Sequence, residues 1–301
     1  MKSTREKVSY CLGLETGRNL QRQFNDMDME LLRKGFEDAI GNNNPKLAQE
    51  EIQSIMQALS QQVEAQQRQF YAKISEQNRQ EGIKILYEDR YLVVLDKPDE
   101  LLSVATLTQD ERTVHTILKK RLGKPVFAVH RLDRDTSGLM MFAYTAEAQF
   151  ELKKQFETHS VSRHYVALVE GRLTEKQGTW KSYLVEDGNY RVHTAQPEQE
   201  GAQLAITHYE VLGEKPTFSF LRFMLETGRK NQIRVHCEAA GHPILGDRKY
   251  GARTNPYNRL CLHAYELHFM HPFLKKNLSF KSPLPAPFQH FTASRQISTL
   301  K

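Results

Sequence analysis

The sequence changes its periodicity at Gly82, and this change constrains the fold more than any other feature. Before Gly82, apolar residues recur at helical spacing, few residues favour strands, and Pro45 is the one proline. After Gly82, short runs of β-branched and aromatic residues alternate with turn-forming residues. The pattern predicts an all-α region over residues 1–82 and an α+β domain over residues 83–301.

The all-α region is predicted to contain two shorter helices and a long one. Apolar residues place the first helix between Val8 and Phe24, and the second ends at Gly41 in the loop GNNNP. From about Leu47 a helical pattern continues to Ile74, about 30 residues and about 45 Å long. Two short helices cannot cover the apolar face of such a helix, so we expect a second copy of the chain as its partner. Packing on the chain's own second domain is the alternative.

The second domain is predicted to be richer in strands than in helices. Helices are expected at 112–121, at 145–158 behind a Thr145 N-cap, and at 231–240. Two strands are expected within 83–98, and further strands at 125–129, 138–144, 164–170, 203–212, 218–225, 260–269 and 277–281. Consecutive strands with occasional helices predict a mixed, largely antiparallel sheet.

Charge is distributed unequally between the two regions. Residues 1–82 contain 11 basic and 12 acidic residues, whereas residues 83–301 contain 31 basic and 24 acidic residues. The basic domain is consistent with a nucleic-acid partner without requiring one. No apolar run approaches the roughly 20 residues that span a bilayer, and no secretory signal is apparent, so we expect a cytoplasmic protein without a membrane partner. The three cysteines are widely spaced and are expected to be small buried residues: Cys11, Cys237 and Cys261.

Residues 130–139, HRLDRDTSGL, place a charged turn between the apolar runs PVFAV and GLMMFA. Asp133 lies between Arg131 and Arg134, and neighbouring cations favour the charged form of a carboxylate. A nucleophile or a base that acts at neutral pH needs that form. The alternative is an ordinary capped turn whose arginines form surface ion pairs.

Several other kinds of site are disfavoured. A metal site built from His130, Asp133 and Asp135 would include two arginines, which repel a dication. His263 and His268 differ in parity along a predicted strand, so they should face opposite sides of it. The chain has neither a GxxxxGK[ST] phosphate loop nor a GxSxG nucleophile turn. We therefore expect no metal and no nucleotide cofactor.

HRLDRDTSGL closely resembles the signature of the RluA family of large-ribosomal-subunit pseudouridine synthases. Other blocks of residues 83–301 follow in the family's order: ILYEDRYLVVLDKPDELLSV, RHYVALVEGRL (163–173), ETGRKNQIRVHCEAAGHPILGDRKYG (226–251) and LCLHAYELHFMHP (260–272). The resemblance implies the pseudouridine synthase fold, with ribosomal or transfer RNA as the partner. It also implies an isomerase that detaches a uracil and rejoins it to the same ribose through carbon 5, without a cofactor.

The resemblance assigns roles to individual residues. Asp133 is the implied catalytic aspartate, which either attacks the anomeric carbon or removes a ribose proton. Arg234 is implied to pair with it through a guanidinium fork. Tyr165 is implied to stack on the flipped target base, and Arg131 to occupy the space that this base leaves. Phosphate contacts are implied for the remaining basic residues: Arg134, Arg163, Arg229, Lys230, Arg248 and Lys249. Without the resemblance, Tyr165 reads as a core strand residue and Arg234 as an exposed helix residue.

Two motifs depart from the family's common pattern. Arg163 stands where lysine is common, which keeps the charge. Lys230 and Asn231 replace the middle pair of GRTHQIR, which adds a charge and removes a histidine. We expect neither change to touch Asp133, Tyr165 or Arg234, and therefore expect an effect on RNA contacts and target choice rather than on chemistry.

The first region has a resemblance of its own. About residues 5–75, from KVSYCLGLETGRNLQRQF to LAQEEIQSIMQAL, resemble the helical dimerisation domain that precedes the catalytic domain of Mip-type FKBP prolyl isomerases. This implies a homodimer through residues 1–82, without prolyl isomerase activity, because a synthase-like domain follows instead. A competing hypothesis is a non-catalytic RNA-binding or folding-assistance protein, with a degenerate synthase domain on a dimeric helical stalk.

Overall fold

The computed structural model describes residue 3 and residues 28–41, 44–58, 82–105 and 112–292. The chain divides into two compact units, Met1–Tyr71 and Ala72–Lys301. Residues 59–81 lie outside the described residues, so the boundary at Gly82 stays a prediction. Among the described helices, none has the length and apolar character needed to cross a membrane.

In the first unit, helix α2 (Met29–Ile40) forms where the second helix was predicted. The Asp28 side chain accepts the backbone N–H groups of Glu30 and Leu31, and the helix ends at Gly41. Residues 49–58 are helical and belong to the predicted long helix. The predicted first helix and the remainder of the long helix lie outside the described residues.

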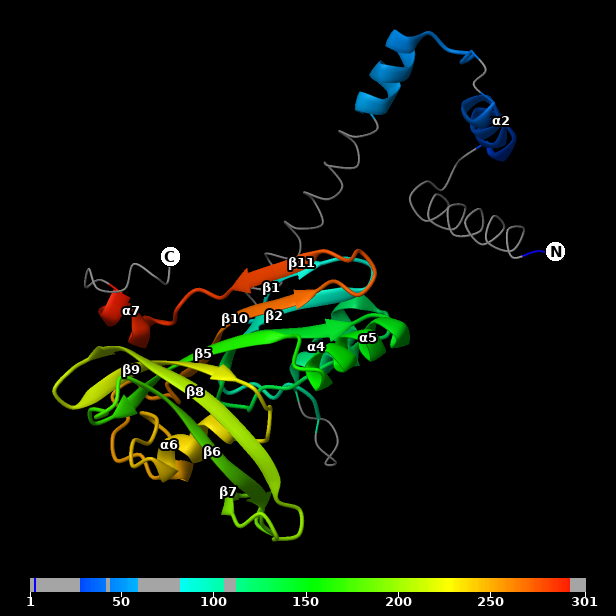
Figure 1. The fold of residues 1–301 in the computed structure, drawn as a ribbon. Coiled ribbons are helices and arrows are strands. Elements are labelled where there is room, and N and C mark those ends of the chain that lie inside the picture. The colour runs from blue at the N-terminus through cyan, green and yellow to red at the C-terminus, as the bar shows by residue number, and fades with distance from the viewer. Residues whose placement is uncertain (1–2, 4–27, 42–43, 59–81, 106–111, 293–301) are drawn as a thin grey trace. The chain divides into compact units, whose positions relative to one another are not determined.

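The second unit is built on one continuous sheet in the order β1-β2-β4-β10-β5-β9-β8-β6-β7, with β3 paired to β4 and β11 paired to β10 (Figure 1). Among the described strands, β4 and β10 pair in parallel and the other pairs are antiparallel. This confirms the mixed, largely antiparallel sheet. The strands are β1 Lys84–Glu88, β2 Leu92–Lys97, β3 Phe127–Ala128, β4 Ser137–Ala143, β5 Ser162–Glu170, β6 Gln177–Glu186, β7 Val192–Ala195, β8 Gln203–Glu214, β9 Phe218–Leu225, β10 Leu262–Met270 and β11 Asn277–Lys281.

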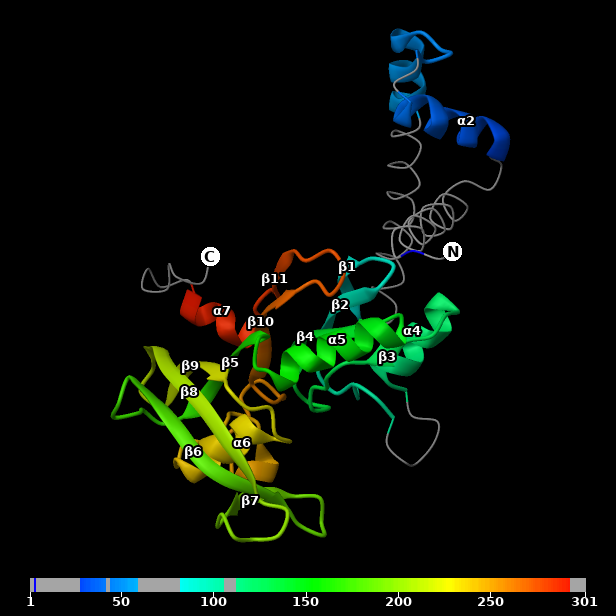
Figure 2. The ribbon, with the colours of Figure 1, turned by 45° about the vertical axis from the view of Figure 1, so that its right-hand side comes forward.

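Helices α4, α5 and α6 lie at two places on the sheet. In both views α4 and α5 lie together near one end and α6 lies near the other (Figures 1 and 2). Thr145 caps α5 by accepting the N–H of Ala148, as predicted. The bounds are α4 Val114–Leu122, α5 Ala146–Glu157, α6 Gln232–Ala239, the 3-10 turn η1 Arg248–Tyr250 and α7 Ala286–Thr292.

The apolar run GLMMFA becomes the inner strand β4, whose residues are all buried. Alternate side chains of a strand face opposite sides of its sheet. Met140 and Phe142 therefore join one core, whereas Leu139, Met141 and Ala143 join a second core beneath α5. Burial on both faces makes β4 a rigid support for the charged turn that precedes it.

Several elements differ from the prediction. Strands β6 and β7 and helix α7 were not predicted, and the strand expected at 125–129 is only the two-residue β3. The strand β6 is half buried and interrupted by polar residues such as Lys181, so its own sequence signal is weak. Its pairing with β8 places Trp180 against Tyr209, with ring centroids 4.5 Å apart. Cross-strand packing thus decides a strand that local periodicity does not.

Cys237 and Cys261 are buried free thiols, as predicted. Burial raises the pKa of both thiols, that of Cys261 to about 12, so neither is a ready nucleophile. Cys11 lies outside the described residues.

Candidate active site

The loop that carries Asp133 is positioned by a close approach of two strands. Gly138 has a φ of 111°, and a Cβ atom there would lie 2.2 Å from the backbone oxygen of Ala264. Only glycine allows this contact, through which β4 pairs with β10. Ala264 in turn pairs with Tyr165 on β5. The sheet therefore brings the loop before β4 next to Tyr165.

Two buried polar side chains fix this loop from beneath. The hydroxyl of Ser103 donates to the Leu132 carbonyl oxygen at 2.7 Å and accepts the Leu132 N–H at 3.0 Å. Lys97 is 1% exposed, and burial lowers the pKa of its ammonium to about 8, although nearby carboxylates oppose the shift. Its Nζ donates to three backbone oxygens at 2.7–2.9 Å, those of Pro98, Leu101 and Arg134. The backbone on both sides of Asp133 is therefore held in place.

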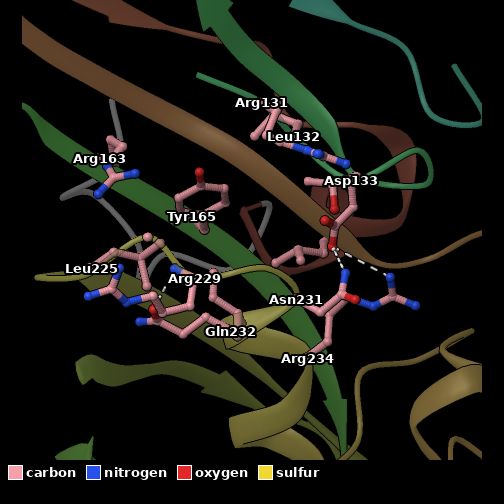
Figure 3. A pocket seen from close by; sticks show the side chains of 14 residues that line it. Arg131, Leu132, Asp133, Arg163, Tyr165, Leu225, Arg229, Asn231, Gln232 and Arg234 are labelled. Carbon is pink, nitrogen blue, oxygen red and sulfur yellow. Dashed lines mark hydrogen bonds and ion pairs between the residues drawn. The ribbon is translucent and has the colours of Figure 1, made fainter. Parts of the chain in front are cut away.

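The Asp133 carboxylate faces the beginning of α6 (Figure 3). Its Oδ2 accepts a hydrogen bond from Asn231 Nδ2 at 2.6 Å and a weaker one from Arg234 Nη1 at 3.5 Å. The side chain remains 23% exposed, so it can meet a ligand. Two donors from the beginning of α6 therefore hold this carboxylate oxygen.

Arg234 pairs with Asp133 as predicted, but through one nitrogen and not through the predicted guanidinium fork. Arg234 instead directs its Nε and Nη2 to the two oxygens of Asp247, both at 2.7 Å, and only Nη1 is left for Asp133. Although burial opposes the shift, the hydrogen bonds with Asp247 raise the pKa of Arg234. The side chains of Arg234 and Asp247 are 8% and 1% exposed. Asp133 therefore faces an arginine that a buried carboxylate already holds.

Asn231 is a candidate functional residue that the sequence analysis missed. It precedes α6 with a left-handed φ of 53°, and its side chain does not cap the helix. The Tyr250 hydroxyl donates to Asn231 Oδ1 at 3.1 Å, which turns Nδ2 toward Asp133. Contrary to the expectation, the Lys230-Asn231 departure therefore contacts Asp133 directly. The sequence separates Asn231 from Asp133 by 98 positions and carries no signal of their contact.

Tyr165 lies in the same pocket as Asp133, and its ring is seen between Arg163 and Asp133 (Figure 3). The residue is 8% exposed. Burial raises the pKa of its phenol, which therefore stays protonated at neutral pH. Apolar residues form part of the wall beside it: Leu132, Leu225, Ile233 and Leu262. A planar ring over an apolar floor suits a stacked planar ligand.

Five of the seven predicted basic residues line either the pocket of Asp133 or a neighbouring cavity. Arg131, Arg163 and Arg229 line the pocket with Asp133, whereas Arg248 and Lys249 line a neighbouring cavity that Arg234 also borders. The Arg163 Nε is buried and has no hydrogen-bond partner within the part of the chain that the structure describes. The remaining two predicted residues, Arg134 and Lys230, line neither the pocket nor the neighbouring cavity. Arg134 is exposed and donates a long bond to the Glu100 carbonyl oxygen, and Lys230 pairs with Glu186.

A separate group of possible metal ligands lies on β5 and β10. His164, Glu266 and His268 offer ligand atoms within 4.8 Å of one another. Lys281 already contacts Glu266 at 2.8 Å. Although burial opposes the shift, hydrogen bonds from Lys281 and His164 lower the pKa of Glu266 to about 2. Of the two histidines weighed on this strand in the sequence, His268 belongs to the group, whereas His263 instead bonds to Ser137 at 2.8 Å.

Comparison with known proteins identifies the family. Residues 91–239 match the RNA pseudouridylate synthase family. The chain is 39% identical over 213 residues to the dual-specificity RNA pseudouridine synthase RluA of Pasteurella multocida, covering 67% of this chain and 93% of that relative. The chain belongs to the RluA-type RNA pseudouridine synthases. These enzymes are isomerases.

Further matches agree with the assignment of the synthase domain. The ribosomal large subunit pseudouridine synthase D of Nitrosomonas europaea is 39% identical over 219 residues, covering 67% of this chain but only 62% of that relative. The solved structure of human RNA pseudouridylate synthase domain containing 4 superimposes with a TM-score of 0.58 at 26% identity, covering 70% of this chain and 92% of that one. Residues 5–90 match the domain amino-terminal to FKBP-type prolyl isomerases, which confirms the second resemblance.

Replacing Asn231 tests its contact with Asp133. In Asn231→Asp a second carboxylate faces Asp133, and repulsion should turn the Asp133 carboxylate from its position, lowering the rate about 100-fold at neutral pH. Because a pair of carboxylates retains a proton more readily, the acid limb of the pH–rate profile should move to higher pH. Single-turnover rates between pH 5 and 9 measure both effects.

Asn231→Gly is the matched control for this prediction. Glycine accepts the left-handed backbone of residue 231 and removes the amide without adding a charge. We expect a smaller loss of rate and an unmoved acid limb. If the aspartate and glycine variants have the same pH profile, a charge at position 231 does not affect the protonation of Asp133, and the prediction is wrong.

Proposed function

We propose that this synthase converts specific uridines of ribosomal or transfer RNA to pseudouridine in the cytoplasm, with Asp133 as the catalytic residue. The observation that carries the proposal is the placement of Asp133. Its partly exposed carboxylate lies in a basic pocket beside Tyr165, and its Oδ2 is held by Asn231 and Arg234. A carboxylate so held is suited either to attack the anomeric carbon or to remove a ribose proton.

In this proposal the target uridine leaves its stack to reach the pocket. Extruding a base costs a few kcal/mol, which new contacts must offset. Tyr165 offers a ring for stacking on the uracil, in the same pocket as the Asp133 carboxylate. Arg131 is exposed on the rim and is assigned the space that the base leaves. The phosphate contacts fall to the other basic residues around the two cavities.

Pseudouridine maps of total RNA, with and without this gene, test the proposal. We expect one or a few positions to lose pseudouridine in the absence of the gene and to regain it on complementation. Binding of uridine-labelled transcripts without any conversion would instead support the non-catalytic hypothesis. Incubating these transcripts with purified protein, and measuring both binding and conversion of uridine, distinguishes the two outcomes.

We also propose that the first unit makes the protein a homodimer. None of the α2 residues is buried, and Leu31, Phe36 and Ile40 are 63%, 47% and 82% exposed. In the helical residues 49–58, Ile55 and Met56 are also more than half exposed. Apolar side chains in such an arrangement need a partner surface, and a second copy presents the same helices.

The oligomeric state should therefore depend on the first unit. We expect light scattering to give a dimer mass for the full chain and a monomer mass for residues 83–301. Dilution of the full chain should lower its apparent mass, whereas the shorter chain should keep its mass at every concentration. A monomeric full chain would refute dimerisation, and a dimeric 83–301 fragment would place the interface elsewhere.

A further inference from the structure

The turn between β6 and β7 presents an aromatic side chain to solvent. The Asp187 side chain accepts the N–H groups of Asn189 and Arg191, both at 2.9 Å, and the Tyr190 N–H donates to the Asp187 carbonyl oxygen. Tyr190 is 74% exposed and has a left-handed φ of 59°. A bulky aromatic residue is a strained choice there, since glycine or asparagine adopts this conformation more easily. Strain of this kind, held by the surrounding bonds, points to a function for the side chain.

Two lysines contact Tyr190. The Nζ of Lys230 lies 5.6 Å from the ring centroid. The Nζ of Lys249 donates to the Tyr190 carbonyl oxygen at 3.0 Å. Lys230 directly precedes Asn231, and Lys249 lines the cavity that Arg234 shares. An exposed aromatic face and two ammonium groups, of which that of Lys230 is paired with Glu186, therefore lie next to the elements that hold Asp133.

This turn is connected to the catalytic carboxylate by a short chain of hydrogen bonds. The N–H of Val192, two residues after Tyr190, donates to the Tyr250 hydroxyl oxygen at 3.3 Å. That hydroxyl donates to Asn231 Oδ1 at 3.1 Å, and Asn231 Nδ2 donates to Asp133 at 2.6 Å. Tyr250 is fully buried. The turn and Asp133 are thus held in a fixed relation to each other.

We propose that Tyr190, Lys230 and Lys249 form a stacking platform for an unpaired base of the RNA substrate near the target uridine. The inference rests on the proposed function, because it assumes RNA at Asp133. Single-stranded RNA is bound where an aromatic face stacks a base and neighbouring cations contact the backbone. Every base has a face to stack, so the platform selects an unpaired nucleotide rather than a particular sequence. It therefore favours loops over duplexes as substrates.

Equilibrium binding of the full chain to a hairpin transcript that it modifies tests the platform. Loss of a stacked base costs 1–3 kcal/mol, so Tyr190→Ala should weaken binding by about 5- to 150-fold. The bond from Lys249 goes to a backbone oxygen and survives the truncation. Tyr190→Phe keeps the ring and should retain most of the affinity. The matched control is Phe150→Ala on α5, which removes an aromatic side chain of similar exposure, 66%, and should leave the affinity unchanged.

Transcripts with single abasic nucleotides identify the contact. At the stacked position, the abasic transcript should bind wild type and Tyr190→Ala equally, whereas abasic sites elsewhere should preserve the difference. An unchanged affinity of Tyr190→Ala, or an equal loss with every transcript, would overturn the platform. A wild-type protein that binds but modifies no transcript refutes the proposed function instead, and the abasic comparison is then made on the most tightly bound hairpin.

Discussion

Asp133→Asn should abolish pseudouridine formation while leaving the protein folded and able to bind RNA. The amide has the shape of the carboxylate and can still accept hydrogen bonds from Asn231 and Arg234, but it carries no charge with which to attack a sugar carbon or remove a proton. We expect the rate to fall by at least about 10⁴-fold. Single-turnover conversion of a substrate transcript measures the loss. Because the side chain is 23% exposed, the free energy of unfolding should change by less than about 1 kcal/mol.

Asp135→Asn is the control for this experiment. Asp135 belongs to the same turn but does not line the pocket of Asp133 and Tyr165. The same chemical change two residues away should therefore leave conversion close to the wild-type rate. If Asp133→Asn retains more than about a hundredth of the wild-type rate, Asp133 is not the reacting group. Equal losses in both variants would mean that the net charge of the turn, rather than Asp133, governs the reaction.

The sequence predicts well those structural features of the pocket that depend on residues close together in the chain. HRLDRDTSGL contains both Asp133 and Gly138. The apolar run that follows predicts a buried strand, and β4 is buried along its whole length. The blocks around Tyr165 and Arg234 are likewise continuous, so their ordered resemblance to one family locates them. Helical periodicity predicts α5, and the preference for threonine at the N-cap position predicts the Thr145 cap.

The sequence does not predict contacts that depend on how distant segments pack. Arg234 has two acidic candidates, Asp133 and Asp247, and only the fold assigns the guanidinium fork to Asp247. Asn231 looks like a substitution in an RNA-binding motif until Tyr250 turns its amide toward Asp133. The turn that contains Tyr190 joins β6 to β7, two strands that the periodicity did not predict. The sequence therefore did not point to the proposed stacking platform either. Cross-strand pairing and buried hydrogen bonds determine these features, and neither has a local signature.

Breaking the buried pair of Arg234 and Asp247 should destabilise the synthase domain strongly. Arg234→Met leaves the Asp247 carboxylate, 1% exposed, without its bidentate partner, and Asp247→Leu leaves the guanidinium without two acceptors. An uncompensated buried charge costs about 3–5 kcal/mol. Urea unfolding of the full chain, followed by the fluorescence of Trp180, measures the loss in the synthase domain alone, since Trp180 is the one tryptophan and lies on β6.

The double variant Arg234→Met, Asp247→Leu separates the stability of the pair from its role at the active site. With both charges removed, neither is left buried and unpaired, so the double variant should be more stable than either single variant. We expect both the double variant and Arg234→Met to convert uridine more slowly than the wild type, because in both Asp133 has lost the cation that contacts Oδ2. Additive losses of stability would show that the two side chains are not coupled. Recovery of activity together with stability would show that Arg234 only supports the fold, and that Asn231 alone positions Asp133.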